Sequence, residues 1–134
     1  MNYRTIGLVT GLLAASTALA GHHEASEAMK PIASSGQVVV VYEVPCVNPD
    51  RGVARLKELI GYEAGKSPIA YTSVATKLDD ALIGAVDVHQ SLAAMEQAFT
   101  WQEADATWLA IQAKALKACK AQLDQISMRI HNAQ

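Results

Sequence analysis

Two short alternating stretches of the chain carry residue types that move protons and bind anions. Asp87 and His89 are two positions apart in one stretch, and Arg129 and His131 are two apart in the other. Side chains two residues apart on a β-strand point to the same face. A carboxylate beside a histidine fixes the tautomer of its ring or lets it act as a base, and arginine anchors anions. The pattern predicts an acid–base group of these four residues, with Glu43 toward the other end of the same face.

The element that must organise such a sheet is the apolar stretch over residues 37–46. It is β-branched or aromatic almost throughout, is apolar on both alternating faces, and stops at a proline before the turn formers Asn48-Pro49-Asp50. A strand that is apolar on both sides must be covered on both sides. We therefore expect residues 37–46 to form the central strand of the sheet.

Apolar periodicity predicts five further elements after this strand. Asp50 is expected to cap the first helix and Ser91 the second, and Thr100-Trp101-Gln102-Glu103 reads as a capping box that restarts or continues the second helix. A tight turn at Asp79-Asp80 joins two of the strands as an antiparallel hairpin. The predicted elements are a helix over 51–66, strands over 69–78 and 81–89, a helix from 91 to about 119, and a strand over 123–131.

The order strand, helix, strand, strand, helix, strand is that of a ferredoxin-like βαββαβ domain, an α+β fold with a four-stranded antiparallel sheet in the order 4-1-3-2. Helices then cover one face only. The other face would leave a contiguous apolar patch, of a size that usually marks an interface. We therefore expect a homodimer in which two sheets pack face to face.

In such a dimer the polar group of Glu43, Asp87, His89, Arg129 and His131 would lie on the face away from the helices and line an enclosed cavity. One interpretation is a site for a small apolar or anionic molecule, with His89 or His131 as acid or base and Arg129 as anion anchor. Trp101 is placed at the pocket rim. The other interpretation is an inter-subunit salt bridge of Asp87 with Arg129, flanked by exposed histidines.

The two cysteines, Cys46 and Cys119, fall at the ends of the first strand and of the second helix. These elements run in the same direction in a ferredoxin-like chain, so both ends lie at one edge of the sheet. The topology predicts a disulfide, and the alternative is two separately buried thiols. A catalytic thiol is disfavoured because neither cysteine has a neighbouring histidine.

The first 20 residues have the pattern of a secretory signal peptide, with Arg4 before an apolar stretch that ends in Ala18-Leu19-Ala20. Cleavage after Ala20 would leave a polar lead over 21–36 and one domain over 37–134, in the periplasm or outside the cell. No membrane association is expected after cleavage. The new terminus would begin Gly21-His22-His23, a pattern that chelates Cu(II) or Ni(II), against the simpler interpretation of a solvated tail.

Composition narrows the class of partner. The chain has 11 basic and 13 acidic residues, so it offers no basic stripe for nucleic acid. It has no phosphate-binding glycine fingerprint and no Gly-x-Ser-x-Gly motif. Helical HxxxH and CxxC spacings are also missing, and neither a metal nor a cofactor is expected in the domain.

The element order and the face pattern resemble the dimeric α+β barrel superfamily, which includes the antibiotic-biosynthesis-type monooxygenases and the stress-responsive barrel proteins. The haem-degrading members of that group use an Asn, a Trp and a His. Asn48, Trp101, Trp108 and His89 depart from that layout, and those roles are not carried over. The resemblance implies an exported ligand-binding or accessory protein, or alternatively a cofactor-independent monooxygenase-like enzyme that uses the His/Asp/Arg group.

Overall fold

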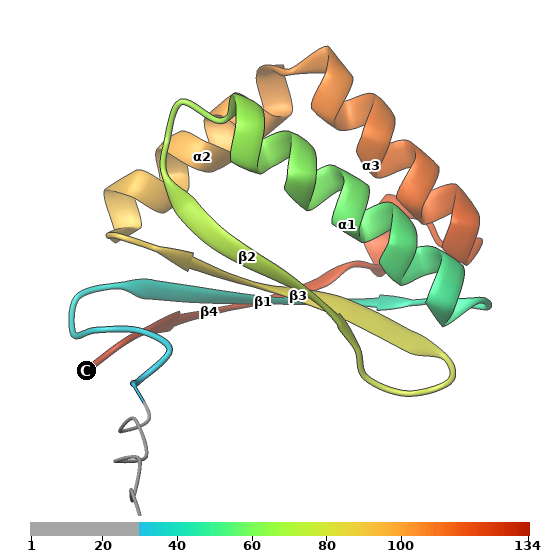
Figure 1. The fold of residues 1–134 in the computed structure, drawn as a ribbon, viewed down its shortest axis with the longest axis horizontal. Coiled ribbons are helices and arrows are strands. Elements are labelled where there is room, and N and C mark those ends of the chain that lie inside the picture. Colours follow the sequence, from blue (N-terminus) through green and yellow to red (C-terminus); the bar gives the residue numbers. More distant parts are fainter. Residues whose placement is uncertain (1–29) are drawn as a thin grey trace, which may run out of the picture.

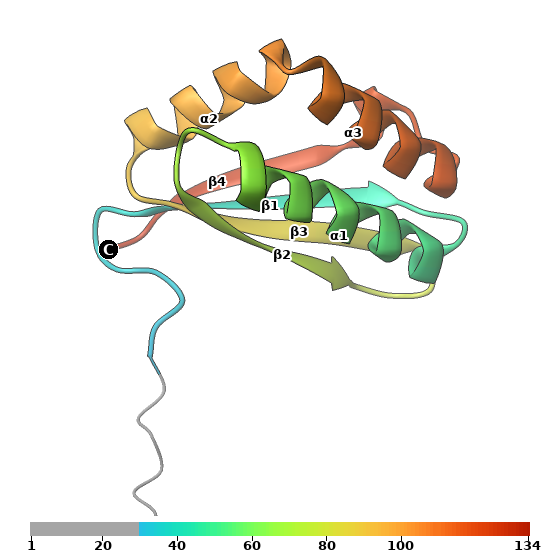
Figure 2. The same cartoon turned by 45° about the horizontal axis from the view of Figure 1, so that its top comes forward.

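The computed structural model describes residues 30–134. The predicted leader, its cleavage site and the His22-His23 metal pattern lie outside the described residues. Three helices lie together on one side of a four-stranded antiparallel sheet, and Figures 1 and 2 show this two-layer arrangement from two directions. The elements are β1 (Val38–Pro45), α1 (Pro49–Lys66), β2 (Tyr71–Lys77), β3 (Leu82–His89), α2 (Leu92–Ala104), α3 (Ala106–Cys119), a 3-10 turn η1 (Leu123–Gln125) and β4 (Ser127–Asn132).

The strand order is β2-β3-β1-β4, which confirms the predicted ferredoxin-like topology with β1 inside the sheet. β1 pairs antiparallel with both β3 and β4. Val38 and Val40 are 1% and 0% exposed and pack with Met95 and Phe99 of α2. The alternate residues of β1 are only half-buried, because no described element covers the other face of the sheet.

Two helix boundaries differ from the predictions. Asn48, not Asp50, caps α1: its side chain accepts a hydrogen bond from the backbone N–H of Arg51 at 3.1 Å. The second helix continues through residues 100–103, which was one of the two predicted alternatives. It breaks and restarts at Asp105, whose side chain accepts from the backbone N–H of Trp108 at 2.8 Å. Ser91 caps α2 as predicted. At both places the observed cap lies a few residues from the predicted boundary residue.

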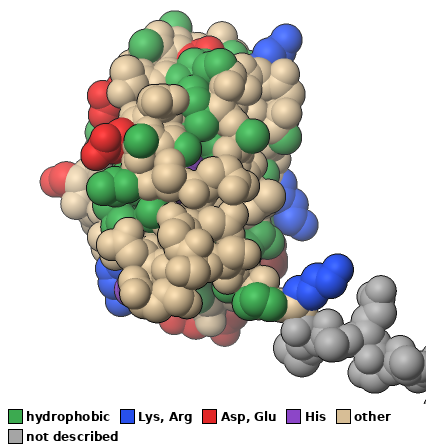
Figure 3. Space-filling model, turned by 90° about the vertical axis from the view of Figure 1, so that its left-hand side faces the viewer, with side chains coloured by type: hydrophobic (Ala, Val, Ile, Leu, Met, Phe, Trp, Pro, Cys, Tyr) green, Lys and Arg blue, Asp and Glu red, His purple; other side chains and the backbone are tan. Residues whose placement is uncertain are grey.

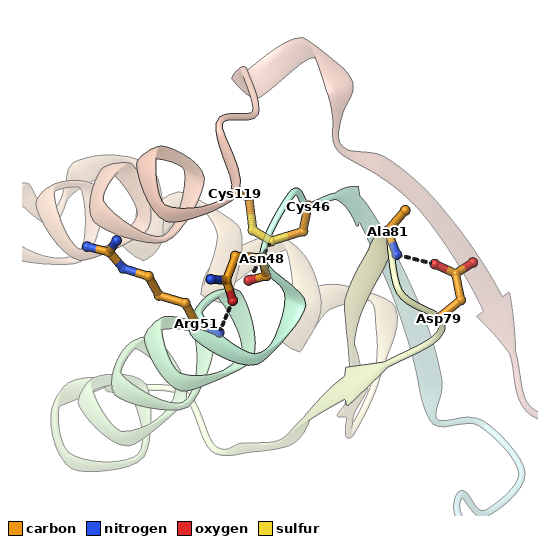
Figure 4. The surroundings of a disulfide bond; sticks show 6 residues. All are labelled: Cys46, Asn48, Arg51, Asp79, Ala81 and Cys119. Carbon is orange, nitrogen blue, oxygen red and sulfur yellow. Dashed lines mark hydrogen bonds between the residues drawn. A yellow bond between two sulfur atoms is a disulfide. The ribbon is translucent and has the colours of Figure 1, made fainter.

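The disulfide between Cys46 and Cys119 is present, and Figure 4 shows it joining the end of β1 to the end of α3. The two cysteines are 73 residues apart in sequence, and a cross-link of that span contributes about 4 kcal/mol of stability in the chain-entropy model. Gly52, in the first turn of α1, packs directly on it. A Cβ at Gly52 would lie 2.6 Å from each Sγ atom, so only glycine lets α1 approach the bridge this closely.

Among the described residues, no helix has the combination of length and apolar character that crossing a bilayer requires. β4 lies at an edge of the sheet without a helix above it. Its two apolar side chains on the helix side, Met128 and Ile130, are 48% and 43% exposed. The helical layer therefore does not extend over the β4 edge of the sheet.

Candidate functional site

The register of the strands divides the predicted polar group between the two faces of the sheet. Directly paired residues of neighbouring strands point to the same face. Asp87 pairs with Val40 and His89 with Val38, so both lie on the buried face beneath the helices. The prediction that Asp87 and His89 face away from the helices is therefore wrong.

The other members of the group do lie on the open face. Arg129 pairs with Val41 and His131 with Val39, and both are exposed. Arg129 donates a hydrogen bond to Glu43 of the same chain. This contact replaces the predicted Asp87–Arg129 salt bridge, and it leaves Arg129 on the opposite side of the sheet from Asp87.

The buried face holds a cavity of about 430 Å³ between the helices and the sheet. Its outer part is lined by Leu109, Leu123 and Met128, which are 42%, 63% and 48% exposed, so the cavity opens between α3 and β4. The inner wall is mostly apolar. Side chains of all four strands and all three helices form it. The lining includes Tyr42, Leu59, Glu63, Ser73, Ala85, Asp87, Phe99, Gln102, Glu103 and Trp108.

Two carboxylic acids form the polar end of this cavity. Glu63 of α1 is 7% exposed and Asp87 of β3 is 4% exposed. Burial raises the pKa of Glu63 to about 7, with the neighbouring charge of Asp87 acting in the same direction. Burial also raises the pKa of Asp87 to about 6, against hydrogen bonds from Ser73 and Tyr42 that favour its charged form. Near neutral pH the pair therefore holds protons that exposed carboxyls would have lost.

Neutral side chains fix the position of Glu63. Trp108 donates from Nε1 to Oε1 of Glu63 at 2.7 Å, and Gln102 donates from Nε2 to the same oxygen at 3.2 Å. Gln102 also donates to the Tyr71 hydroxyl at 3.0 Å. These bonds join α1, α2, α3 and β2 at one point, so the site forms only when the helical layer is assembled.

His89 is buried next to this group without joining it. It is 0% exposed, and neither ring nitrogen has a hydrogen-bond partner among residues 30–134. Its ring stacks on Tyr71 with centroids 4.7 Å apart and meets the Phe99 ring edge-on at 6.1 Å. Burial lowers the pKa of His89, which keeps the ring neutral. His89 is thus a packed core residue, and it is not part of the cavity lining.

The aromatic predictions have mixed outcomes. Tyr42 and Trp108 face the helix–sheet interior as predicted. Trp101 is half-buried and stacks on Tyr62 with centroids 6.3 Å apart, and it does not line the cavity. The tryptophan at the pocket is Trp108. No group of three or more His, Cys, Asp or Glu side chains with metal-binding geometry occurs within residues 30–134.

Sequence reasoning missed Glu63, the centre of the site. Glu63 continues the helical spacing of Leu56, Leu59 and Ile60 toward the end of α1. A carboxylate on the apolar stripe of a helix indicates a buried acid. The spacing of Glu63 therefore could have identified it from the sequence. Gln102 and Trp108 carry no comparable signal, because their meeting with Glu63 spans 39 and 45 residues.

Comparisons with known proteins agree on the fold. A candidate antibiotic biosynthesis monooxygenase from Caulobacter crescentus superimposes with a TM-score of 0.53 at 13% identity, over 75% of this chain and 92% of that one. SnoaB, a cofactor-independent oxygenase from Streptomyces nogalater, gives 0.52 at 16% identity, over 75% and 95%. The chain has the fold of these monooxygenase-type α+β proteins.

A conserved protein from Methanosarcina mazei gives a TM-score of 0.50 at 13% identity, over 73% of this chain and 93% of that one. No protein-family model matches the sequence, and no curated protein matches it. The structural likenesses agree with the predicted ferredoxin-like α+β fold. Identities this low do not transfer an activity or a partner.

Proposed function

We propose that the protein is an exported binding or accessory protein that holds a small, largely apolar molecule in the cavity between its helices and its sheet. The observation that carries this proposal is the cavity of about 430 Å³ with apolar walls and two buried carboxyl groups. Cavities of a few hundred cubic ångströms with few polar groups are typical ligand sites. Buried acids with raised pKa values concentrate at functional sites, because burial without a function costs stability.

Export is supported by two independent features. The first 20 residues have the composition of a signal peptide. The Cys46–Cys119 disulfide persists in oxidising compartments such as the periplasm or the cell exterior. We therefore place the mature protein in one of these compartments.

A homodimer is supported by the uncovered face of the sheet. Val39 and Val41 of β1 and Val86 of β3 are half-buried there, and Val74 of β2 is 52% exposed. Adjacent valines on a helix-free sheet face favour burial against a second sheet. Figure 3 views one end of the molecule, where hydrophobic side chains are scattered among other atoms and acidic side chains lie mainly toward the left and lower borders.

The alternative of a cofactor-independent oxygenase has less support. It relied on Asp87, His89, Arg129 and His131 acting together, and the register places them in pairs on opposite faces. A catalytic acid or base must also reach an open space next to substrate. His89 is packed against two aromatic rings, and Arg129 pairs with Glu43. The geometry therefore favours binding.

The test compares two neighbouring substitutions on β3. Ala85 is 7% exposed and lines the cavity, whereas Val86 is on the opposite face. We expect the exported protein to bind the neutral dye N-phenyl-1-naphthylamine, with a rise in dye fluorescence. Ala85→Leu fills the cavity and should weaken binding by about tenfold or more, because it adds apolar volume where the ligand lies. Val86→Leu is the matched control and should not change it.

Equal binding by both variants, or no binding by the wild type, would overturn the proposal. Native mass spectrometry of the same preparation adds a second measurement. It reports the mature terminus, the number of subunits and any retained small molecule.

A further inference from the structure

The chemistry of the cavity narrows the class of ligand, and this inference depends on the proposed binding function. Every charged side chain in the described cavity lining is acidic: Glu63, Asp87 and, nearer the opening, Glu103. The basic side chain predicted as an anion anchor, Arg129, lies beyond the sheet and pairs with Glu43. An anion entering this cavity would lose its water and find no basic side chain in the described lining to pair with.

Glu63 can accept a hydrogen bond from a bound molecule in addition to those from the protein. Trp108 and Gln102 both donate to Oε1, and Oε2 accepts neither bond. Glu63 is more than nine-tenths buried, lines the cavity and also interacts with the Tyr71 hydroxyl. An ionised carboxylate has about four acceptor positions, so it can still accept from a bound molecule. On Asp87, the Ser73 hydroxyl donates to Oδ1, and the Tyr42 hydroxyl is a second donor to the carboxyl. Two buried carboxyls thus offer acceptors at the polar end of an otherwise apolar cavity.

Among residues 30–134, no side chain next to the two carboxyls supplies the positive charge that a ligand would bring. Tyr42 of β1 and Tyr71 of β2 face the carboxyls, and burial raises the pKa of each hydroxyl, so both stay neutral. His89 lies next along β3 and is neutral because burial lowers its pKa. Glu103 of α2 adds negative charge, and Trp108 of α3 is a neutral donor.

We propose that the cavity binds small apolar amines, with the ammonium group on Glu63 and Asp87 and the hydrocarbon part against apolar side chains such as Leu59 and Phe99. An ammonium has donors for both carboxyls and is itself positively charged, which makes these hydrogen bonds the charge-assisted kind. The empty site holds protons on its carboxyls near neutral pH. Binding of the cation favours their ionised forms, so each bound amine displaces protons to solvent.

The experiment uses three probes with one carbon skeleton: 3-phenylpropan-1-amine, 3-phenylpropan-1-ol and 3-phenylpropanoate. Isothermal titration of the exported protein at about pH 6 should give amine binding at least about tenfold tighter than alcohol binding, and carboxylate binding weaker than both. The same titration in two buffers with different ionisation enthalpies measures the number of protons released on binding. Binding of the amine should release protons, and binding of the alcohol should not. Amine affinity should rise by about tenfold between pH 5.5 and pH 8 as fewer protons need to be displaced.

Two variants locate the effect. Glu63→Gln keeps an acceptor for Trp108 but removes the ionisable group, so it should weaken amine binding by about tenfold and leave alcohol binding unchanged. Glu58→Gln is the matched control, because Glu58 is on the exposed side of the same helix and pairs with Arg55. It should change neither affinity.

The outcomes separate this inference from the proposed function. Equal amine and alcohol binding, weakened alike by Ala85→Leu, would overturn the amine preference and leave the binding function supported. Tightest binding of the carboxylate, or no proton release with the amine, would also overturn the preference. Binding of none of the three probes would count against both proposals.

Discussion

The two faces of the sheet hold similar residue types in opposite physical situations. On the covered face, Asp87 and Glu63 are nearly inaccessible and their pKa values are raised. On the open face, Glu43 pairs with Arg129, whose side chain is 59% exposed. The comparison shows that side-chain type does not decide which carboxylate belongs to a site. Burial by the helical layer does, because desolvation raises the pKa values of the carboxyls beneath it.

The largest expected effect comes from placing a charge on each face in turn. Val40 is 0% exposed under α2, and the adjacent Val41 faces the open side and pairs with Arg129. Val40→Asp should lower the free energy of unfolding by about 4 kcal/mol, because it buries a charge without a partner. Val41→Asp should lower it by less than about 1 kcal/mol in a single subunit. Urea unfolding measures both, and equal losses would show that the faces do not differ as described.

The next largest expected effect is a pH dependence of the free energy of unfolding, caused by Glu63 on the covered face. Folded Glu63 keeps its proton up to about pH 7, whereas in the unfolded chain it ionises near its ordinary pKa of 4.5. Its contribution to stability is thus complete below pH 4.5 and is lost as the pH rises through 7. Between pH 4 and pH 8 the wild type should lose about 3 kcal/mol relative to Glu63→Gln. Glu58→Gln, measured in the same urea series, should follow the wild type, and a flat difference for Glu63→Gln would contradict the burial effect.

A smaller effect distinguishes the two histidines. His89 is buried with both ring nitrogens unpartnered, and His131 is exposed on the open face. His89→Leu should raise the free energy of unfolding by about 1 kcal/mol near neutral pH, since it removes a buried polar group without bonds. The gain should grow below pH 6.5, where the unfolded histidine takes up a proton that the folded one does not. Thermal unfolding measures the effect, with His131→Leu as the exposed comparison, and a loss of stability in His89→Leu would indicate a hidden partner for the ring.

The smallest effect is expected at the ion pair of the open face. In a single subunit, Arg129→Ala should change the free energy of unfolding by less than about 1 kcal/mol, because exposed pairs gain little and are screened by salt. The difference should shrink further in about 1 M sodium chloride. A larger loss that resists salt would mean that Arg129 is buried in solution, as a second subunit on this face would cause.

Much of the fold could be predicted because it depends on local sequence features. The valine-rich run 37–46 marked the inner strand, Ser91 marked the start of α2, and Cys46 with Cys119 fell at ends that the topology brings together. The caps at Asn48 and Asp105 were misplaced by a few residues, because several polar residues compete near each helix start. These errors did not change the order of the elements.

The candidate site was harder to predict because it depends on register and on distant contacts. Strand neighbours were correctly ordered, yet the assignment of Asp87 and His89 to the open face failed, since a shift of one residue moves every side chain of a strand to the other face. Glu63 carried a readable signal on its helix stripe and was overlooked. Its partners Gln102 and Trp108 are set by how α2 and α3 pack over α1.

The sequence by itself determined the order of helices and strands, the central position of the first strand and the pairing of its two cysteines. These follow from side-chain periodicity and chain direction, which are local properties. Only the tertiary structure decided that Asp87 joins Glu63 inside a cavity while Arg129 stays outside. The physical reason is that strand register and helix packing, and not residue type, decide which polar groups lose their water.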